Sequence, residues 1–372
     1  MKTYKDKILT YLLTPASWIY GAVVKARNKL YDSGILKETE HDVAVVSVGN
    51  LTIGGTGKTP HVEYLVDHLK SQYEIAVLSR GYKRKTKGFV LATPTSTPEQ
   101  IGDESYQIYR KFDKDIKVAV CEDRNLGIHE LMRLFPSIEL VILDDAFQHR
   151  KVKPTVSILL LDKNRPIEDD HLLPLGRLRE PVHGKDRADI VIVTKCPAYM
   201  NPLEYGLEEK KLDLLSFQKA YFSTVRYEEI KPVFPENARY NASLSALTEE
   251  DNVLLVTGIA FPRTFVKYFK DYPFDVKVMR FPDHHSFSRK DIDKIASLYR
   301  SMGGKKKIIV TTEKDAVRIK NNPYFPHELK SYIFYLPIKI HMHYDQEKVD
   351  LIEQIEIYMR QRRRKGKEKT ES

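Results

Sequence analysis

The sequence predicts an α/β protein with two domains, a larger one built on a parallel sheet and a smaller one that follows it. Three observations support this fold class. Short apolar runs alternate with helical segments between residues 43 and 193, as in parallel sheets that helices cover on both faces. A glycine-rich turn joins the first apolar run to a helical segment. After Phe217 the pattern changes, and a second series of strand-like and helical segments begins.

Length and composition agree with two folded domains. The chain has 372 residues, of which 42% are hydrophobic and 30% charged, so each domain can bury its own core. The formal net charge of +10 favours an anionic partner, whether nucleic acid, a phospholipid surface or a phosphorylated substrate. The two cysteines, Cys121 and Cys196, are too few for a disulfide framework or a four-cysteine zinc site. A reducing compartment facing the cytosol therefore fits best.

Residues 1–33 are predicted to form a helix at a membrane interface. Residues 8–24 are rich in apolar side chains and include Trp18, and basic residues flank them on both sides. Thr10 and Pro15 interrupt the run, which falls short of the roughly 20 apolar residues of a membrane span. Aromatic and basic side chains beside an apolar face suit the headgroup region of an anionic membrane. The alternative is a helix docked on the protein's own surface.

The glycine-rich turn, residues 47–60, is predicted to bind phosphate at the junction of a strand (43–48) and a helix (61–69). Glycines allow backbone N–H groups to converge on phosphate oxygens, a lysine reaches the β- and γ-phosphates, and a threonine hydroxyl ligates Mg²⁺. The predicted nucleotide-binding residues here are Thr52, Gly54, Gly55, Thr56, Gly57, Lys58 and Thr59. Thr52 stands where such loops usually have their first glycine. A flexible turn would explain the paired glycines but not Lys58 and Thr59 at a helix start.

The predicted first domain covers residues 34–216. Its other strands are the apolar runs 75–78, 118–120, 140–143, 156–161 and 190–193. Their carboxyl ends should form the edge where ligands bind. The second domain, residues 217–350, has strand-like runs at 253–256, 276–279, 307–310 and 333–338. Residues 351–372 are expected to be a helix end and a basic tail, either solvated or in contact with membrane or nucleic acid.

Acidic residues near the predicted sheet edge are candidate metal ligands. Asp144 and Asp145 directly follow an apolar strand, where a nucleotide-binding enzyme places the carboxylate that holds Mg²⁺. An isolated Asp-Asp pair would more often be a turn or a helix cap. Glu180 is a further candidate ligand, and Arg179 beside it can neutralise phosphate charge. The alternative for these two is a surface ion pair.

Transfer of phosphate to an alcohol also needs a group that accepts the hydroxyl proton. Asp103 is one candidate, although its place after Gly102 at a helix start also suits a simple cap. The loop 281–287 supplies Asp283, His284 and His285, where an Asp-His pair can orient or activate a base. The alternative for this loop is a surface turn.

Seven motifs together resemble the tetraacyldisaccharide 4′-kinase family. They lie in order along most of the chain, at residues 48–60, 79–82, 102–104, 143–150, 172–181, 281–287 and 311–317. The resemblance implies transfer of the γ-phosphate of ATP, with Mg²⁺, to the 4′-hydroxyl of a tetraacyldisaccharide 1-phosphate in lipid A biosynthesis. It also implies a peripheral inner-membrane enzyme facing the cytoplasm, and two α/β domains with the active cleft between them. We expect a monomer whose partners are the lipid A precursor and an anionic membrane surface, with no nucleic acid.

Matching positions transfer the family's roles to this sequence. The resemblance implies Lys58 and Thr59 as the phosphate-loop residues, Asp144, Asp145 and Glu180 as acids of the metal region, and Asp103 as the base assisted by His284. Gln148 matches a segment near the nucleotide or the lipid headgroup. Two positions depart from the family pattern: Ala146 replaces an expected glycine, and His285 replaces an expected aromatic residue.

A phosphate-loop GTPase or metallochaperone remains an alternative because it would share the glycine-rich loop. Guanine-binding members usually carry Asn/Thr-Lys-x-Asp, whereas here Thr194, Lys195 and Cys196 are followed by Pro197. A nucleic-acid-binding protein would use the basic tail and would not need Lys58.

Overall fold

Two sheets organise the chain, and each belongs to a unit of its own. The structure, a computed structural model, describes the chain apart from residues 1–3, 239–242, 260–261, 284, 344–348 and 371–372. The first unit comprises Met1–Val225 and Ile340–Ser372, and the second comprises Arg226–Lys339.

The sheet of the first unit has the strand order β14-β8-β7-β6-β1-β5-β2-β4-β3. Its strands are β1 (Ala44–Asn50), β2 (Ile75–Ser79), β3 (Val90–Leu91), β4 (Lys117–Val120), β5 (Leu140–Asp144), β6 (Val156–Asp162), β7 (Ile190–Thr194), β8 (Lys219–Tyr227) and β14 (Ile338–Met342). In the sheet, each pair of neighbouring strands between β8 and β4 is parallel. The short edge strand β3 runs antiparallel to β4. Strands β1, β5, β6 and β7 are buried along their whole length, which explains why they are apolar runs in the sequence.

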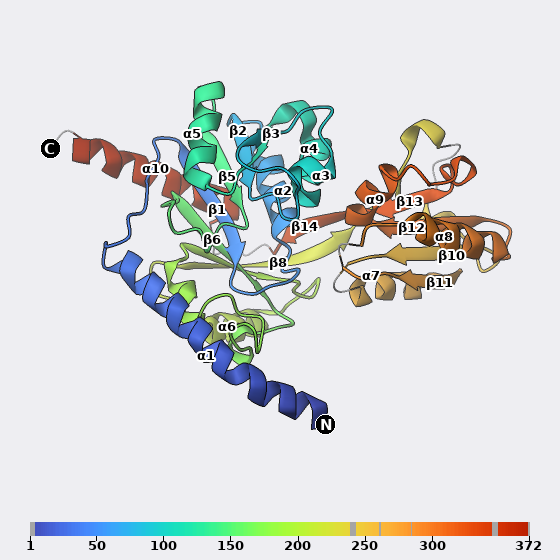
Figure 1. The fold of residues 1–372 in the computed structure, drawn as a ribbon, viewed down its shortest axis with the longest axis horizontal. Coiled ribbons are helices and arrows are strands. Elements are labelled where there is room, and N and C mark those ends of the chain that lie inside the picture. The colour runs from blue at the N-terminus through green and yellow to red at the C-terminus, as the bar shows by residue number, and fades with distance from the viewer. Residues whose placement is uncertain (1–3, 239–242, 260–261, 284, 344–348, 371–372) are drawn as a thin grey trace. The chain divides into compact units, whose positions relative to one another are not determined.

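Helices surround this sheet (Figure 1). They are α1 (Tyr4–Asp32), α2 (Lys58–Leu69), α3 (Pro98–Ile101), α4 (Asp103–Phe112), α5 (Arg124–Leu134), α6 (Pro202–Leu212) and α10 (Leu351–Thr370). Ile128 and Leu131 of α5 pack in one core cluster with Val45 of β1 and Val141 of β5. Helix α2 buries Val62, Leu65, Val66 and Leu69. The predicted mixed α/β architecture with a largely parallel sheet is confirmed.

The second unit is a smaller α/β structure whose strand order is β11-β10-β12-β13-β9. Its elements are β9 (Lys231–Pro232), β10 (Asn252–Thr257), α7 (Arg263–Tyr268), β11 (Asp275–Arg280), α8 (Arg289–Ser301), β12 (Lys307–Thr312), α9 (Glu313–Lys320) and β13 (Ile333–Leu336). The four longer strands are parallel, and β9 pairs antiparallel with β13. Ile292 and Ile295 of α8 pack in a core cluster with Leu254 and Ile309 of the sheet.

The boundaries of the two units differ from the expected segments 217–350 and 351–372. Strand β8 pairs with β7 from Lys219 to Phe222, so its first residues belong to the first sheet. The apolar run 333–338 contains the end of the second sheet, β13, and the start of β14, which returns to the first. Helix α10 buries Leu351, Ile355 and Met359, and Arg362 binds Asp189 of the first unit at 2.9 Å. Apolar residues on α10, followed by Arg362, thus attach the start of the expected tail.

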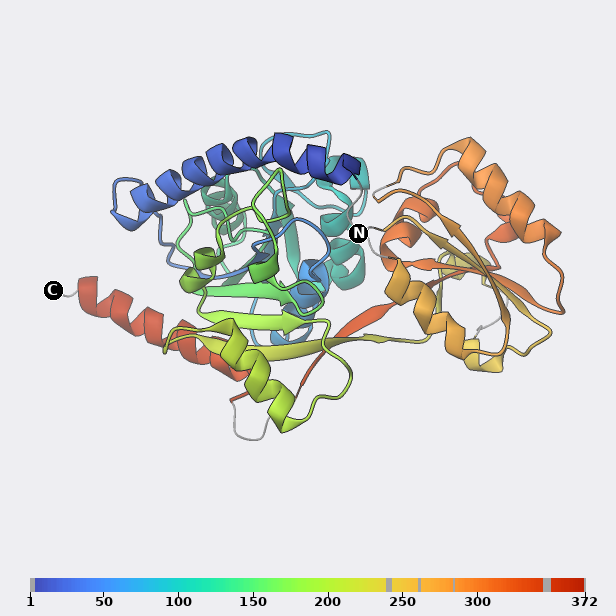
Figure 2. The ribbon, with the colours of Figure 1, turned by 90° about the horizontal axis from the view of Figure 1, so that it is seen from below.

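Helix α1 runs along the outside of the first unit (Figure 2). It is 29 residues long and contains Pro15. In the described part of the chain, no helix is both long and apolar enough to cross a membrane.

Candidate active site

The glycine-rich loop joins β1 to α2 at the carboxyl edge of the first sheet. Gly57 precedes α2 with a φ of 92°, in the left-handed region that glycine adopts without strain. A Cβ atom at Gly49 would lie 2.6 Å from the Cβ of Phe147. Gly49 therefore allows the segment after β5 to pack closely on β1, and this packing explains a glycine that the phosphate-loop pattern left unassigned.

The start of the loop is held as a short ladder. Ile53 N donates to Arg177 O at 2.8 Å, and Arg179 N donates to Leu51 O at 2.7 Å. Thr52 forms an isolated antiparallel bridge with Leu178. The extended backbone at Thr52 explains why no glycine is needed at the position where phosphate loops usually have their first one.

Three side chains hold successive carbonyl groups of the loop. Lys195 Nζ donates to Gly55 O at 2.5 Å, and Thr194 Oγ1 donates to Thr56 O at 3.0 Å. His61 Nδ1 lies 2.7 Å from Gly57 O. The loop is therefore fixed from the ends of neighbouring strands and from its own helix.

A cluster of opposite charges lies beside the loop. Lys58 Nζ is 3.5 Å from Asp145 Oδ1. Arg179 binds both carboxylate oxygens of Asp145, at 2.8 and 3.2 Å, and its Nη1 also lies 3.3 Å from Gln148 Oε1. Burial opposes the ionisation of Asp145, but the charges of Lys58 and Arg179 outweigh it and lower the pKa of this carboxyl group. The structure thus brings together four of the predicted site residues.

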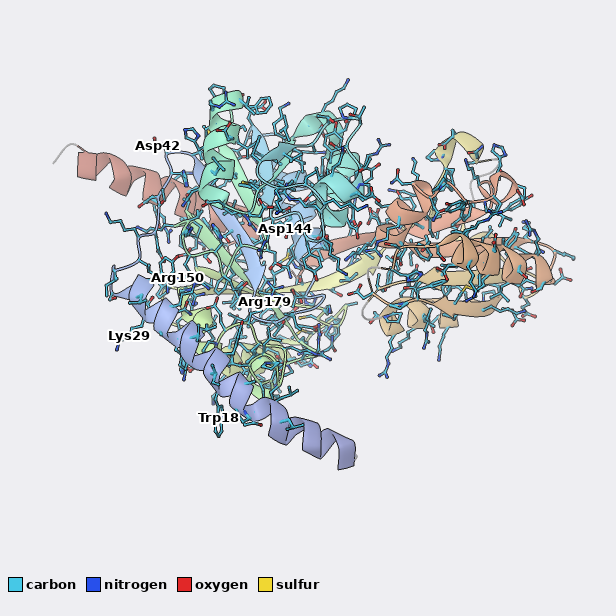
Figure 3. The ribbon with its side chains drawn as sticks, in the orientation of Figure 1. Trp18, Lys29, Asp42, Asp144, Arg150 and Arg179 are labelled. Atoms are coloured by element: carbon cyan, nitrogen blue, oxygen red, sulfur yellow. The ribbon has the colours of Figure 1, made fainter. Side chains whose placement is uncertain are left out.

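Asp144 differs from its neighbour because its carboxylate is buried and incompletely bonded. It is the last residue of β5, opposite Val48 of β1, and its side chain is seen in Figure 3. Among the described residues, none forms a hydrogen bond with its Oδ1 atom. Burial and then the charge of Asp145 raise the pKa of Asp144 to about 7, although the charge of Lys58 opposes this shift. A buried carboxylate oxygen without a partner is costly, and a bound cation would relieve that cost.

Glu180 is also buried, but it is already half paired. Its Oε2 atom accepts from Arg187 at 2.8 Å and from Asn28 of α1 at 2.9 Å, while Oε1 has no partner in the described chain. No group of three or more His, Cys, Asp or Glu side chains among the described residues is placed to hold a metal. The three acids that the sequence grouped as metal ligands therefore do not converge in this structure.

Asp103 is the first residue of α4, directly after Gly102. The hydroxyl groups of Ser79 and Ser105 lie 2.6 Å apart and attach the start of α4 to the end of β2. The charge of Glu104 contributes to the raised pKa of Asp144. The first turn of α4, which carries Asp103, thus lies within electrostatic range of the Asp144 carboxylate.

His284 lies outside the described residues. Its neighbour His285 is bound within the second unit: Nε2 lies 3.0 Å from Asp291 Oδ2, and the ring stacks on Phe281 with centroids 4.8 Å apart. These contacts give His285 a packing role at the position where an aromatic residue was expected.

One face of α1 packs behind the site. Tyr20 Oη donates to Arg179 O at 2.8 Å, and Arg27 donates to Gln148 O. Ser17 Oγ donates to Leu172 O at 2.9 Å. The opposite face presents apolar side chains that are between 62 and 74% exposed: Leu12, Trp18, Ile19 and Val23. The helix is thus docked on the protein along one face while an apolar stripe stays exposed along the other.

A family model described as tetraacyldisaccharide-1-P 4′-kinase matches residues 9–356. The chain belongs to this family. It is 51% identical over 342 residues to the tetraacyldisaccharide 4′-kinase of Bacteroides thetaiotaomicron, a match that covers 90% of each chain. It is 47% identical over 339 residues to that of Phocaeicola vulgatus, covering 91% of this chain and 92% of the relative.

A solved structure also resembles this kinase. The crystal structure of LpxK from Aquifex aeolicus in complex with ATP has a TM-score of 0.71 at 29% identity, and the match covers 94% of this chain and 99% of that one. The family predicted from the motifs is confirmed, and with it the activity of a lipid A 4′-kinase. The GTPase or metallochaperone alternative is not supported.

Sequence reasoning missed several residues that shape the site of this tetraacyldisaccharide 4′-kinase. His61, Thr194 and Lys195 hold the loop carbonyls, and Asn50 Nδ2 donates to Thr56 Oγ1 at 2.7 Å. Thr194 and Lys195 follow an apolar strand, as Asp144 does. Polar residues at the end of a parallel strand were therefore the signal that could have found them.

Proposed function

We propose that this kinase binds Mg²⁺-ATP at residues 52–59 and transfers the γ-phosphate to the 4′-hydroxyl of a tetraacyldisaccharide 1-phosphate. The observation that carries the proposal is the buried Oδ1 of Asp144, which has no partner among the described residues and lies beside the strand that leads into the glycine-rich loop. Loop N–H groups and the start of α2 suit phosphate oxygens. Lys58 would exchange Asp145 for the β- and γ-phosphates, and Arg179 and Gln148 would contact the nucleotide.

The donor set fits Mg²⁺ at one carboxylate. One oxygen of Asp144 accepts from no residue in the described ranges, whereas Asp145 and Glu180 already accept from arginines. Asp144 and Thr59 would hold the ion, with Asp145 and Glu180 acting through water. The ion would neutralise phosphate charge in the transition state.

Asp103 would accept the proton of the sugar hydroxyl as it attacks the γ-phosphate. Purified kinase, labelled ATP and the tetraacylated disaccharide 1-phosphate in detergent micelles test the proposal. Wild type should transfer label to the lipid, and Lys58→Ala should lose both ATP binding and transfer. Asp103→Asn should lower kcat far more than it weakens ATP binding. Equal losses of kcat and ATP affinity would instead make Asp103 a helix cap.

We also propose that α1 places the kinase, as a monomer without a nucleic-acid partner, on the cytoplasmic face of the inner membrane. The exposed stripe of Leu12, Trp18, Ile19 and Val23 supports contact with lipid. Deleting the whole helix would also remove the bonds that Tyr20 and Arg27 make behind the site, so a change confined to the outer face is the sharper experiment.

The triple variant Trp18→Ser, Ile19→Ser, Val23→Ser should no longer sediment with anionic phospholipid vesicles. The matched control replaces Tyr199, Leu203 and Leu207, which are exposed apolar residues in or near α6, with serine. The control should sediment as wild type does. Undiminished sedimentation of the α1 triple variant would contradict the membrane contact.

A further inference from the structure

We propose that Thr194, Lys195 and His61 are positioning residues that orient the peptide groups of the glycine-rich loop toward the nucleotide phosphates. The inference rests on the proposed binding of ATP at this loop. It assigns a role to three side chains that lie outside the phosphate-loop motif or at its edge, and that need not touch the nucleotide themselves.

The planar peptide bond couples each carbonyl group of the loop to the next N–H group. Because C=O and N–H of one trans peptide point in opposite directions, fixing the carbonyl of one residue fixes the N–H of the next. Thr194 holds the carbonyl of Thr56 and so directs the N–H of Gly57. His61 holds the carbonyl of Gly57 and so directs the N–H of Lys58, which belongs to the helix turn whose N–H groups lack partners within the helix.

The hydrogen bonds of the loop agree with this orientation. The carbonyls of Gly55, Thr56 and Gly57 all accept from side chains. By contrast, the N–H groups of Gly55 and Gly57 donate to no described residue. The N–H of Thr56, in the peptide that Lys195 holds, donates to Gly54 O at 3.0 Å. With its carbonyls occupied and the N–H groups of Gly55 and Gly57 left without a partner in the described chain, the loop is arranged for an anion.

Lys195, which binds the carbonyl of Gly55, has a strained backbone conformation. Its φ is 59°, in the left-handed region that costs free energy for a residue other than glycine. Its ammonium group bridges Gly55 O, at 2.5 Å, and the buried carboxylate of Asp162, at 2.8 Å. Asp162 therefore fixes the lysine from behind, and the lysine fixes the loop.

His61 has a single arrangement of its ring proton. A carbonyl oxygen only accepts, so Nδ1 carries the proton toward Gly57 O, and Nε2 accepts from Ser223 Oγ at 2.9 Å. These two hydrogen bonds make the ring a fixed link between the loop and β8.

Thr194→Val tests the proposal because it removes the hydroxyl donor while keeping the shape of the side chain. The affinity for Mg²⁺-ATP, measured by calorimetry, should fall about tenfold, as expected when a buried acceptor loses its partner. KM for ATP should rise by the same factor, with KM for the lipid unchanged. The unfolding midpoint should also fall, because the buried carbonyl of Thr56 loses its donor. Thr194→Ser should restore ATP binding to within about threefold, since serine keeps a donor.

The matched control is Thr311→Val in β12, because Thr311 is buried and its hydroxyl has no partner among the described residues. This variant should bind ATP as wild type does. An unchanged ATP affinity in Thr194→Val, or a lower unfolding midpoint without a change in KM for ATP, would overturn the positioning role.

Lys195→Met is the second test and decides the matter if Thr194→Val does not fold. It should weaken ATP binding at least as much as the threonine change, and normal binding would overturn the proposal. The failure of the underlying function looks different: wild type itself would bind no ATP, or Lys58→Ala would bind it normally.

Discussion

Asp144 in the first unit and Asp315 in the second are both buried aspartates close to the carboxyl end of a parallel strand, yet their surroundings are opposite. Asp315 accepts from Gly258 N at 2.8 Å, Thr312 Oγ1 at 2.7 Å and Arg318 Nη1 at 3.0 Å. Asp144 has an oxygen with no partner in the described chain. Burial raises the pKa of both groups, and for Asp315 these partners oppose the shift.

A structural carboxylate and a functional one differ in their hydrogen-bond partners. Burial alone does not separate them, because both side chains are almost inaccessible. The difference is whether the protein itself supplies the partners. Asp315 ties α9 to the loop after β10, whereas one carboxylate oxygen of Asp144 is used by no residue that the structure describes.

The largest expected effect is on stability, in Asp315→Asn. The amide cannot accept from all three donors and leaves Arg318 without its carboxylate, and breaking such a buried pair costs about 3–5 kcal/mol. Urea unfolding should show this loss. kcat of the remaining folded protein should change far less than in Asp144→Asn. If this variant were as stable as wild type, Asp315 would not be a structural carboxylate.

Asp144→Asn should show the reverse pattern. Removing the carboxylate charge should lower kcat by about 100- to 1000-fold, the size of effect seen when a preorganised electrostatic group is lost. The unfolding midpoint at pH 8 should not fall, because the amide removes a buried charge. Kinase assays and thermal unfolding of the same preparations measure both quantities. Wild-type activity in this variant would remove Asp144 from the site.

A pH series sharpens the contrast in protein freed of metal and nucleotide by EDTA and dialysis. Asp144 titrates at about 7 when folded and near 3.9 when unfolded. Between these values the folded state binds more protons, so this group makes wild type less stable as pH rises through the window. Asp144→Asn has no carboxyl group at this position and should not lose stability in this way as pH rises. Its stability relative to wild type should therefore increase from pH 4 to pH 8, by at most about 4 kcal/mol at 1.36 kcal/mol per pKa unit.

Chemical unfolding of both proteins at several pH values measures that difference. Saturating Mg²⁺-ATP should reduce it, because a bound cation favours the ionised carboxylate of wild type. A difference that stayed constant from pH 4 to pH 8 without ligand would mean that Asp144 titrates normally.

The smallest effect is expected for Glu180→Gln, because the hydrogen bonding of Glu180 is intermediate between that of Asp144 and that of Asp315. Glu180 pairs with Arg187 and Asn28 through one oxygen only. The amide should cost about 1–3 kcal/mol of stability and lower kcat about tenfold. A loss of kcat equal to that of Asp144→Asn would group Glu180 with Asp144, and a loss of stability alone would group it with Asp315.

The sequence predicted those elements whose signal is local. The runs around Val46, Ile142 and Leu159 were recognised as strands because helices and neighbouring strands bury them on every side. The rule that parallel strands bring their carboxyl ends to one edge predicted that Asp145 lies at the same edge as the loop of Lys58, but not the ion pair between the two.

Features that depend on distant partners were not predictable in the same way. The sheet to which β8 or β14 belongs depends on its neighbours and not on its own residues, so the unit boundaries were misplaced. The amphipathic pattern of α1 cannot say that Tyr20 and Arg27 bond behind the site. Nothing in the sequence around His61 distinguishes it from other residues of α2. Its role is visible only from its contacts with Gly57 and Ser223.

Strands β8 and β14 connect the second unit to the first. His343 N donates to Phe222 O, and Glu228 N donates to Pro337 O, so β8 and β14 run as an antiparallel ribbon with Val225 and Ile340 opposite each other. Topologically, residues 226–339 are an insertion at the tip of a hairpin. A tight turn in their place would leave every strand of the larger sheet in its original register, a natural design for grafting a different module onto the same nucleotide-binding scaffold.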